Sequence, residues 1–225
     1  MTRKQRRDGF TLIELLLVIT IIAIIASIAV PNLISAKATS NESAAISTLR
    51  NLSSLQVAVS NRKFIDIDAD GTGEFGYFGE LSGAVPARGI AGATLLPPLL
   101  SAAFQSVNAG IVTKGGFHYI IYLPDVTGAG IEETPANYAN VDADLAELAW
   151  CAYAWPTNQG TSGSRAFFVN QVGEVLGTSN ALQNYSGAGA APPHDAAFQN
   201  PNSIMGSYDP AAAANDTGIW ASTSP

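Results

Sequence analysis

The sequence predicts an α+β fold in which one long N-terminal helix packs on a small antiparallel β-sheet. Apolar residues run without a charge from Leu15 to Val30 and then recur every three or four residues as far as Val59, which is the period of a helix. Further along the chain, short runs of aromatic and branched residues end at turn-forming residues, as strands do. A chain of 225 residues is long enough for one main domain.

The first part of the predicted helix is long enough to cross a membrane. Residues 10–30, 21 in all, would span about 31 Å as a helix, the thickness of the hydrocarbon core of a bilayer. The basic residues Arg3, Lys4, Arg6 and Arg7 precede this segment, so we expect a single pass with a cytoplasmic N-terminus and an exported remainder. A cleaved signal peptide fits less well, because its apolar core is usually about 7 to 15 residues long and carries no acid.

That acid is Glu14, which stands in an otherwise apolar run. A carboxylate at the centre of a bilayer costs about 2.5 to 3.5 kcal/mol, and less near the edge. A lone anchor leaves such an acid without a purpose, unless it reaches back to the headgroups. We therefore expect Glu14 to have a partner inside the apolar phase.

Residues 6–16, RRDGFTLIELL, resemble the N-terminal signature of type IV prepilins and type II secretion pseudopilins. The resemblance implies a pilin-like fold and a prepilin peptidase that cuts between Gly9 and Phe10 and methylates the new amine of Phe10. It places Glu14 at the fifth mature position. It also places Pro31 where members of the family commonly have a helix-kinking proline, and loss of a backbone hydrogen bond there should bend or open the helix.

The resemblance implies a structural protein that polymerises. After processing, the positive amine of Phe10 would be paired with the carboxylate of Glu14 in a neighbouring copy. Losing one partner of a buried pair typically costs about 3 to 5 kcal/mol, so the pair would set the register of the filament. The partners implied are the peptidase, the inner membrane, and copies of this chain and other pilins in a type IV pilus or a secretion pseudopilus, in the periplasm or on the cell surface. The alternative is a non-polymerising or tip minor pilin whose head binds a ligand.

Five segments are expected: a leader (1–9), a transmembrane and assembly helix (10–31), an amphipathic half of the same helix (32–60), a globular head (61–176) and a Gly/Ala/Pro-rich wrap or tail (177–225). We place the helix from residue 10 to about residue 60, and a short helix around 102–107 inside a long connection. Three or four strands are expected in the head, at 117–123, 148–155, 165–171 and 174–176.

An acidic loop in the head is a candidate calcium site. Asp66, Asp68, Asp70 and Glu74 occupy positions 1, 3, 5 and 9 of a loop with glycine at position 6, as in the first part of an EF-hand. Position 12 is Tyr77, where an EF-hand needs a bidentate acid, so a true EF-hand is not predicted. The loop either binds Ca²⁺ or is a solvated acidic turn. Calcium sites in the heads of major pseudopilins support the first reading.

Catalysis and nucleic-acid binding have little support. No nucleophile motif accompanies His118 or His194, and neither a P-loop nor a dinucleotide fingerprint occurs. The net charge of −7 becomes −10 once the leader is removed, with 7 basic and 17 acidic residues, which argues against binding nucleic acid.

The single cysteine and the tryptophans are expected to be structural. Cys151 has no disulfide partner within the chain and lies in a strand-like run, so we expect it to be buried. Trp150 and Trp155 are expected in the core and not in a carbohydrate platform, whereas for Trp220 both remain open. The lack of a C-terminal cysteine pair argues against a disulfide-looped pilin.

Overall fold

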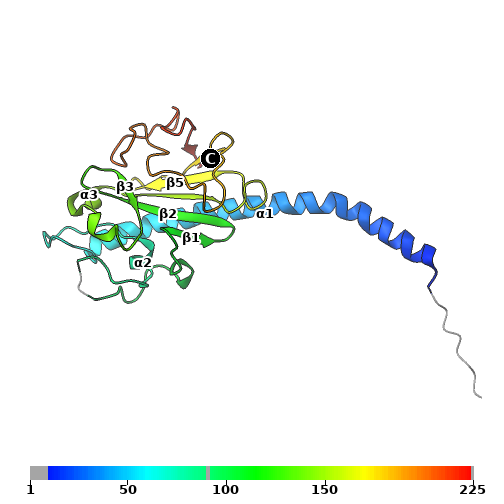
Figure 1. Cartoon of the computed structure of the whole chain (residues 1–225), viewed down its shortest axis with the longest axis horizontal. Helices are drawn as coiled ribbons and strands as arrows, with labels where there is room; N and C mark the ends of the chain where they lie inside the picture. The colour runs from blue at the N-terminus through cyan, green and yellow to red at the C-terminus, as the bar shows by residue number, and fades with distance from the viewer. Residues whose placement is uncertain (1–9, 90–91, 224–225) are drawn as a thin grey trace, which may run out of the picture.

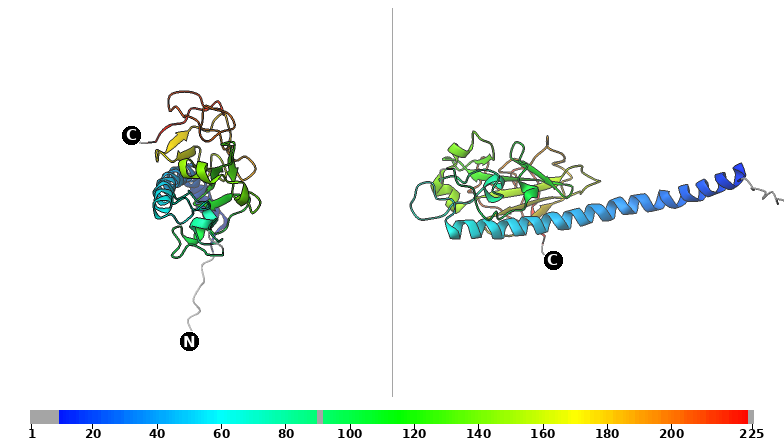
Figure 2. Two further views of the ribbon diagram at one scale, coloured as in Figure 1. Left: turned by 90° about the vertical axis from the view of Figure 1, so that its left-hand side faces the viewer. Right: turned by 90° about the horizontal axis from the view of Figure 1, so that it is seen from below.

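A computed structural model describes residues 10–89 and 92–223. The long helix α1 (Leu12–Arg62) runs the length of the molecule, and its second half supports a head formed by the rest of the chain (Figure 1). Its 51 residues span about 77 Å. The helix continues unbroken through Pro31 and curves gently in its exposed half (Figure 2). It ends where Lys63 adopts a left-handed conformation, with φ of 52°.

The head contains an antiparallel sheet in the order β1-β2-β4-β5-β6-β7, with β3 also paired to β2. The strands are β1 (Ile111–Lys114), β2 (Phe117–Pro124), β3 (Gly130–Glu132), β4 (Cys151–Pro156), β5 (Ala166–Asn170), β6 (Leu176–Thr178) and β7 (Ala221–Ser222). The predicted α+β fold, a long helix on a small antiparallel sheet, is confirmed. The prediction of three or four strands was too low, because β1, β3 and β7 are short and carry little pattern.

Short helices account for the other boundary errors. The helix α3 (Ala143–Leu148), capped by the side chain of Asp142, takes up the start of the strand expected at 148–155, which begins instead at Cys151. The strand expected at 174–176 lies two residues later, as β6. The predicted helix near 102–107 is a 3₁₀ turn (Ala102–Phe104), and neither α2 (Phe78–Leu81) nor the 3₁₀ turn Tyr138–Asn140 was predicted.

Both faces of the sheet are covered. One face packs against the second half of α1 and the 64–104 connection, around Leu49, Phe117 and Phe167. The other packs against the C-terminal segment, which contributes Phe198 and Trp220. Residues from 177 onward therefore wrap the sheet and complete a second core. Buried side chains of α1 begin at position 38, so the preceding part of the helix contributes no buried side chain to either core.

Candidate functional site

The tip of α1 presents an exposed aromatic residue next to a capped helix start. Phe10 is 90% exposed. Thr11 caps the helix: its hydroxyl accepts a hydrogen bond from the backbone N–H of Glu14 at 3.2 Å. In return, the backbone N–H and hydroxyl of Thr11 donate to Glu14 Oε2 at 2.9 and 2.8 Å. This reciprocal capping box holds the carboxylate beside the start of the helix. Gly9 lies outside the described residues.

The half of α1 that precedes the head is apolar and unpartnered within the described residues. By length and composition α1 can cross a membrane, and none of its most apolar 18-residue window is buried in the structure. Its hydroxyls satisfy themselves on the helix: Thr20 Oγ1 donates to the carbonyl of Leu16 at 2.7 Å, and Ser27 Oγ to that of Ile24 at 2.7 Å. The segment thus exposes continuous apolar surface with one unneutralised charge, at Glu14.

The acidic loop brings three of its four predicted ligands together. Carboxylate oxygens of Asp66, Asp68 and Asp70 lie within 4.8 Å of one another, at the end of the head where α1 terminates. The loop is held in shape by its own side chains, with Asp68 Oδ1 accepting from the N–H of Asp70 at 3.2 Å and Asp70 Oδ1 accepting from that of Thr72 at 2.6 Å. This convergence of hard oxygens suits a calcium ion.

Glu74 is not part of that cluster. Its side chain is fully buried, and its Oε1 accepts a hydrogen bond from the backbone N–H of Ile67 at 2.7 Å. Its Oε2 lies 3.6 Å from Arg88 Nη1, so the carboxylate closes the loop from inside instead of facing an ion. The position-9 pattern of the sequence therefore identified a buried acid that lies outside the cluster of the three aspartates.

Glu147 on α3 is near enough to the three aspartates for their charges to act on it. Burial, followed by the charges of Asp70 and Asp68, raises the pKa of Glu147. Its Oε1 is shielded from water and has no hydrogen-bond partner among the described residues. In the sequence, Asp142 could have indicated the start of α3, the helix that carries Glu147. That α3 lies near the 63–76 loop follows from tertiary packing, which no local pattern shows.

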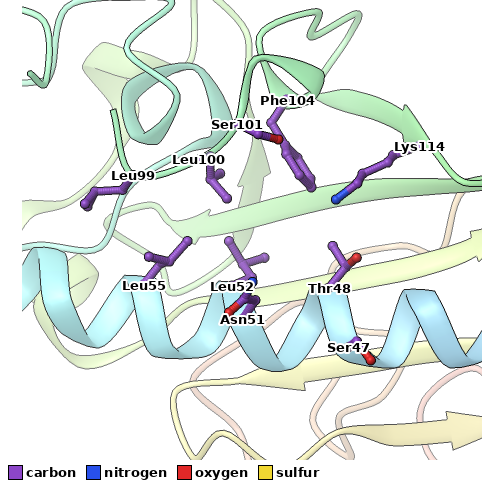
Figure 3. A pocket seen from close by; sticks show the side chains of 10 residues that line it. All are labelled: Ser47, Thr48, Asn51, Leu52, Leu55, Leu99, Leu100, Ser101, Phe104 and Lys114. Atoms are coloured by element: carbon purple, nitrogen blue, oxygen red, sulfur yellow. The ribbon is translucent and has the colours of Figure 1, made fainter. Parts of the chain in front are cut away.

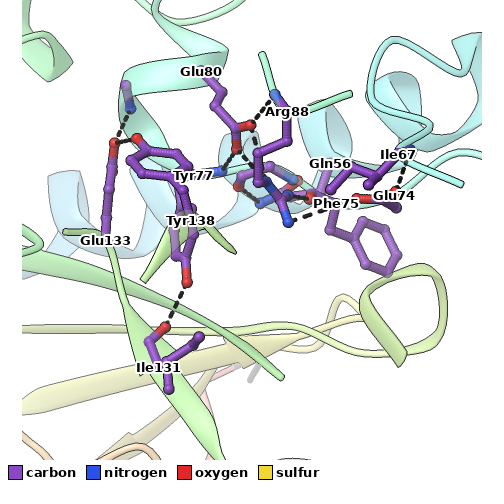
Figure 4. A network of polar contacts seen from close by, with 12 residues as sticks. Gln56, Ile67, Glu74, Phe75, Tyr77, Glu80, Arg88, Ile131, Glu133 and Tyr138 are labelled. Atoms are coloured by element: carbon purple, nitrogen blue, oxygen red, sulfur yellow. Dashed lines mark hydrogen bonds and ion pairs between the residues drawn. The ribbon is translucent and has the colours of Figure 1, made fainter. Parts of the chain in front are cut away.

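A buried ion network ties this loop to the head (Figure 4). Arg88 Nε lies 3.0 Å from Glu80 Oε1, and its guanidinium also donates to the carbonyl of Phe75. Gln56 on α1 clamps both backbone groups of Gly76, donating to its carbonyl at 2.7 Å and accepting from its N–H at 2.9 Å. These contacts fix the path of the chain between α1 and α2.

A second buried acid lies beside this network (Figure 4). Glu133 Oε1 accepts hydrogen bonds from Tyr138 Oη at 2.6 Å and from the N–H of Gly79 at 2.9 Å. Burial nevertheless raises the pKa of Glu133 to about 7. A side chain at position 79 would not fit, because an added Cβ would lie 2.4 Å from Glu133 Oε1.

A groove of about 330 Å³ runs beside α1 in the head (Figure 3). Leu52 and Leu55 of α1 face Leu99 and Leu100 across it, and Lys114 lies at one end with its ammonium 4.7 Å above the ring of Phe104. Its walls contain no carboxylate, histidine or cysteine, and its polar groups are three hydroxyls, one amide and one ammonium. The geometry is that of a mixed polar and apolar seam between the helix and the connection.

The remaining candidates are structural. Cys151, Trp150 and Trp155 are buried in or beside the sheet, as expected. Trp220 is 1% exposed and belongs to the second core, which settles the question left open by the sequence in favour of packing. Burial lowers the pKa of His118, whose Nδ1 is 2.8 Å from Thr113 Oγ1.

Comparison with known proteins bears on the first part of the chain. Residues 4–30 match the family described as the prokaryotic N-terminal methylation motif. Over 72 residues the chain is 42% identical to the type IV major pilin protein PilA of Myxococcus xanthus (strain DK1622). The chain is thus similar to a type IV major pilin over part of its length, and its methylation-motif match lies in the N-terminal segment. The pilin-type match covers 32% of this chain and 32% of the relative, so the chain spans about a third of the length of the curated relative it matches. No solved structure matches this chain.

Proposed function

We propose that this chain is a structural subunit that polymerises through α1 into a type IV pilus or the related secretion pseudopilus. The observation that carries the proposal is the exposed, apolar first half of α1 with a single acid near its tip, attached to a head whose core is complete without it. Such a surface is not stable in water, so it must lie in lipid or against other copies of itself. The similarity to a major pilin favours the pilus over the pseudopilus.

Processing at Gly9 and Phe10 prepares the tip for assembly. In this proposal prepilin peptidase removes residues 1–9 and leaves the amine of Phe10 free at an exposed position. Residues 10–31 first hold the subunit in the inner membrane, with the head (61–176) and the wrap (177–225) on the outer side. The amphipathic half (32–60) joins the two parts rigidly, because α1 is continuous.

Glu14 can keep its cap and still receive a neighbour. Both hydrogen bonds from Thr11 end on Oε2, which leaves Oε1 for the Phe10 amine of an adjacent subunit. A charge-assisted contact of this kind, shielded from water in a filament core, is favourable at one register and costly at others. We propose that apolar packing supplies affinity and that Glu14 selects the register.

The decisive experiment compares Glu14→Gln with Glu14→Ala and Glu14→Leu. Glu14→Gln keeps an acceptor for the Thr11 cap but removes the charge, so it separates helix capping from assembly. We expect normal membrane insertion and loss of filaments with all three variants, and mass spectrometry of wild-type filaments should find Phe10 as the methylated first residue. Unchanged filaments with Glu14→Leu would favour the minor-subunit alternative, in which the head binds a ligand.

We further propose that Ca²⁺ occupies the acidic loop, held by Asp66, Asp68 and Asp70. The support is the convergence of three carboxylates within 4.8 Å, with a buried, unpaired oxygen of Glu147 against them. An ion there would offset the repulsion among these groups and tie the end of α1 to α3. Glu74 is not proposed as a ligand, because its oxygens are engaged by Ile67 and Arg88.

A further inference from the structure

A groove of about 530 Å³ opens where α1 enters the head. Ile34, Lys37 and Asn41 of α1 form one wall, and the β1–β2 turn (115–116) and the β4–β5 loop (157–162) form the rest. The two loops are fixed to α1 and to each other: Asn41 Nδ2 donates to the carbonyl of Ser162 at 2.8 Å, and the N–H of Thr157 donates to that of Gly116 at 3.0 Å. The groove is therefore held open by bonds that its ligand does not have to break.

The position of this groove relative to a bilayer follows from the point at which the apolar surface of α1 ends. The exposed apolar surface continues beyond residue 30 to Leu33, 69% exposed, and Ile34, 39% exposed. Lys37 is exposed and is the first charged residue after Glu14. Residues 10–34 form a mainly apolar stretch of about 38 Å, which a hydrocarbon core of about 30 Å accommodates when the helix tilts. Lys37 follows Ile34 by about 4.5 Å along the helix, within a headgroup layer of about 5 to 8 Å. In an anchored subunit, Lys37 and the mouth of the groove lie at the level of the lipid phosphates.

The chemistry of the groove favours an anion. Lys37 supplies an ammonium and Asn158 an amide, whereas the hydroxyls of Thr157 and Thr161 donate to the carbonyls of Gly116 and Asn158 and serve to shape the groove. The neighbouring carboxylate, Glu42, is directed into the loop, where its Oε1 accepts from the N–H of Ser164 at 2.7 Å and from that of Arg165 at 3.2 Å. One of its oxygens is thus already engaged by two backbone donors.

The distribution of charge on the head also favours contact with an anionic lipid at this end. Without the leader the chain has a formal charge of −10, and the exposed acids of the 66–70 loop lie at the opposite end of the head. An anionic bilayer repels that end and attracts the end that carries Lys37. From the position of the groove in the bilayer, its fixed shape and its charge, we infer that it binds the phosphate of an anionic phospholipid in the membrane-anchored subunit. This contact holds the head upright on the bilayer.

The inference rests on the membrane-anchored state within the proposed function, and its test needs no filaments. The full chain is placed in nanodiscs of zwitterionic lipid, with or without phosphatidylglycerol, and amide hydrogen exchange is followed in segments 114–117 and 157–164. One lysine near an anionic surface contributes about 1 kcal/mol, or about fivefold in binding. We therefore expect roughly fivefold slower exchange with phosphatidylglycerol for the wild type, no such difference for Lys37→Glu, and the wild-type difference for Arg50→Glu, a matched charge reversal at an exposed position further along α1.

Several results would overturn the inference. Equal exchange in both lipids is one, and a lipid effect that survives Lys37→Glu is another. Protection by millimolar inorganic phosphate in purely zwitterionic nanodiscs would identify a site for free anions instead of lipid. If Lys37→Glu altered filaments but no lipid-dependent protection existed, the groove would belong to contacts between copies. Absence of filaments from the wild type would refute the proposed function while leaving this readout intact.

Discussion

Replacement of Arg88 by methionine tests whether the buried ion network holds the acidic loop to the head. Arg88 is 7% exposed and reaches two acids, Glu80 at 3.0 Å and Glu74 at 3.6 Å, which are 1% and 0% exposed. The methionine would fill much of the same space but leave both carboxylates buried without a counter-charge. Breaking a buried pair in this way costs about 3 to 5 kcal/mol, because the uncompensated charge remains out of water.

The loss of stability caused by Arg88→Met should depend on pH. Burial already raises the pKa of Glu74, and the charge of Arg88 opposes that rise, so removal of Arg88 raises the pKa further. A carboxyl whose pKa is higher in the folded than in the unfolded state binds its proton more tightly when folded. Its stabilising contribution is therefore present at low pH and is lost as the pH rises through the folded value. The deficit of the variant should be smaller at pH 5 than at pH 8, by about 1.4 kcal/mol for each unit of added shift.

The measurement is urea unfolding of the full chain in detergent, followed by tryptophan fluorescence. Trp150, Trp155 and Trp220 are all buried, so their emission reports loss of the head. Arg50→Met removes the same charge from an exposed position and should change the free energy of unfolding by less than about 0.5 kcal/mol. A deficit for Arg88→Met below about 1 kcal/mol, or one that is the same at pH 5 and pH 8, would refute the reasoning.

Three other changes have distinct expected outcomes. Since the pKa of Glu133 is raised to about 7, the wild type should lose about 2 to 3 kcal/mol of stability between pH 4.5 and pH 8, and Glu133→Gln should flatten that dependence in the same unfolding assay; an unchanged slope would contradict the assignment. Asp68→Asn should raise the melting temperature in chelator, by relieving repulsion, but lower it at saturating calcium, where binding stabilises by about 2.7 kcal/mol at a hundredfold excess over Kd; the same sign in both conditions would remove the metal site. Trp220→Ala should cost about 3 to 5 kcal/mol by opening the second core, and near-wild-type stability would mean that the C-terminal wrap is dispensable.

Much of the fold was readable from the sequence because its signals are local. The continuous apolar run and its change to a helical period predicted α1 to within two residues at each end. The strands β2, β4 and β5 were found because each has enough aromatic and branched residues to form a pattern. The strands that were missed have two to four residues, too few for any period to appear, and they exist because a neighbouring edge pairs with them.

The candidate sites likewise divide into those with a local signal in the sequence and those formed by tertiary packing. The spacing of Asp66, Asp68 and Asp70 predicted that their oxygens converge, because a tight loop folds within its own sequence. The spacing could not show that Glu74 turns inward to Arg88, 14 positions later, or that Glu147 approaches from α3. A buried acid is chosen by partners that only tertiary packing brings near, so no short window of sequence contains that information.

The first half of α1 is exposed and apolar, and its second half packs in the head. The proposed assembly and the folding of the head can therefore be tested separately. Buried side chains begin at Ala38, so substitutions before that point remove no contact from either core. A change at Glu14 should therefore leave the unfolding of the head unaltered, whereas Arg88→Met acts on the head without touching the surface proposed to polymerise. Because α1 is continuous, however, the head cannot shift its register without moving the tip. In the proposed filament, a neighbour that fixes Glu14 would also fix the height of the acidic loop and of the lysine groove. Contacts between heads would then be set by a single acid about 36 Å below the first buried residue.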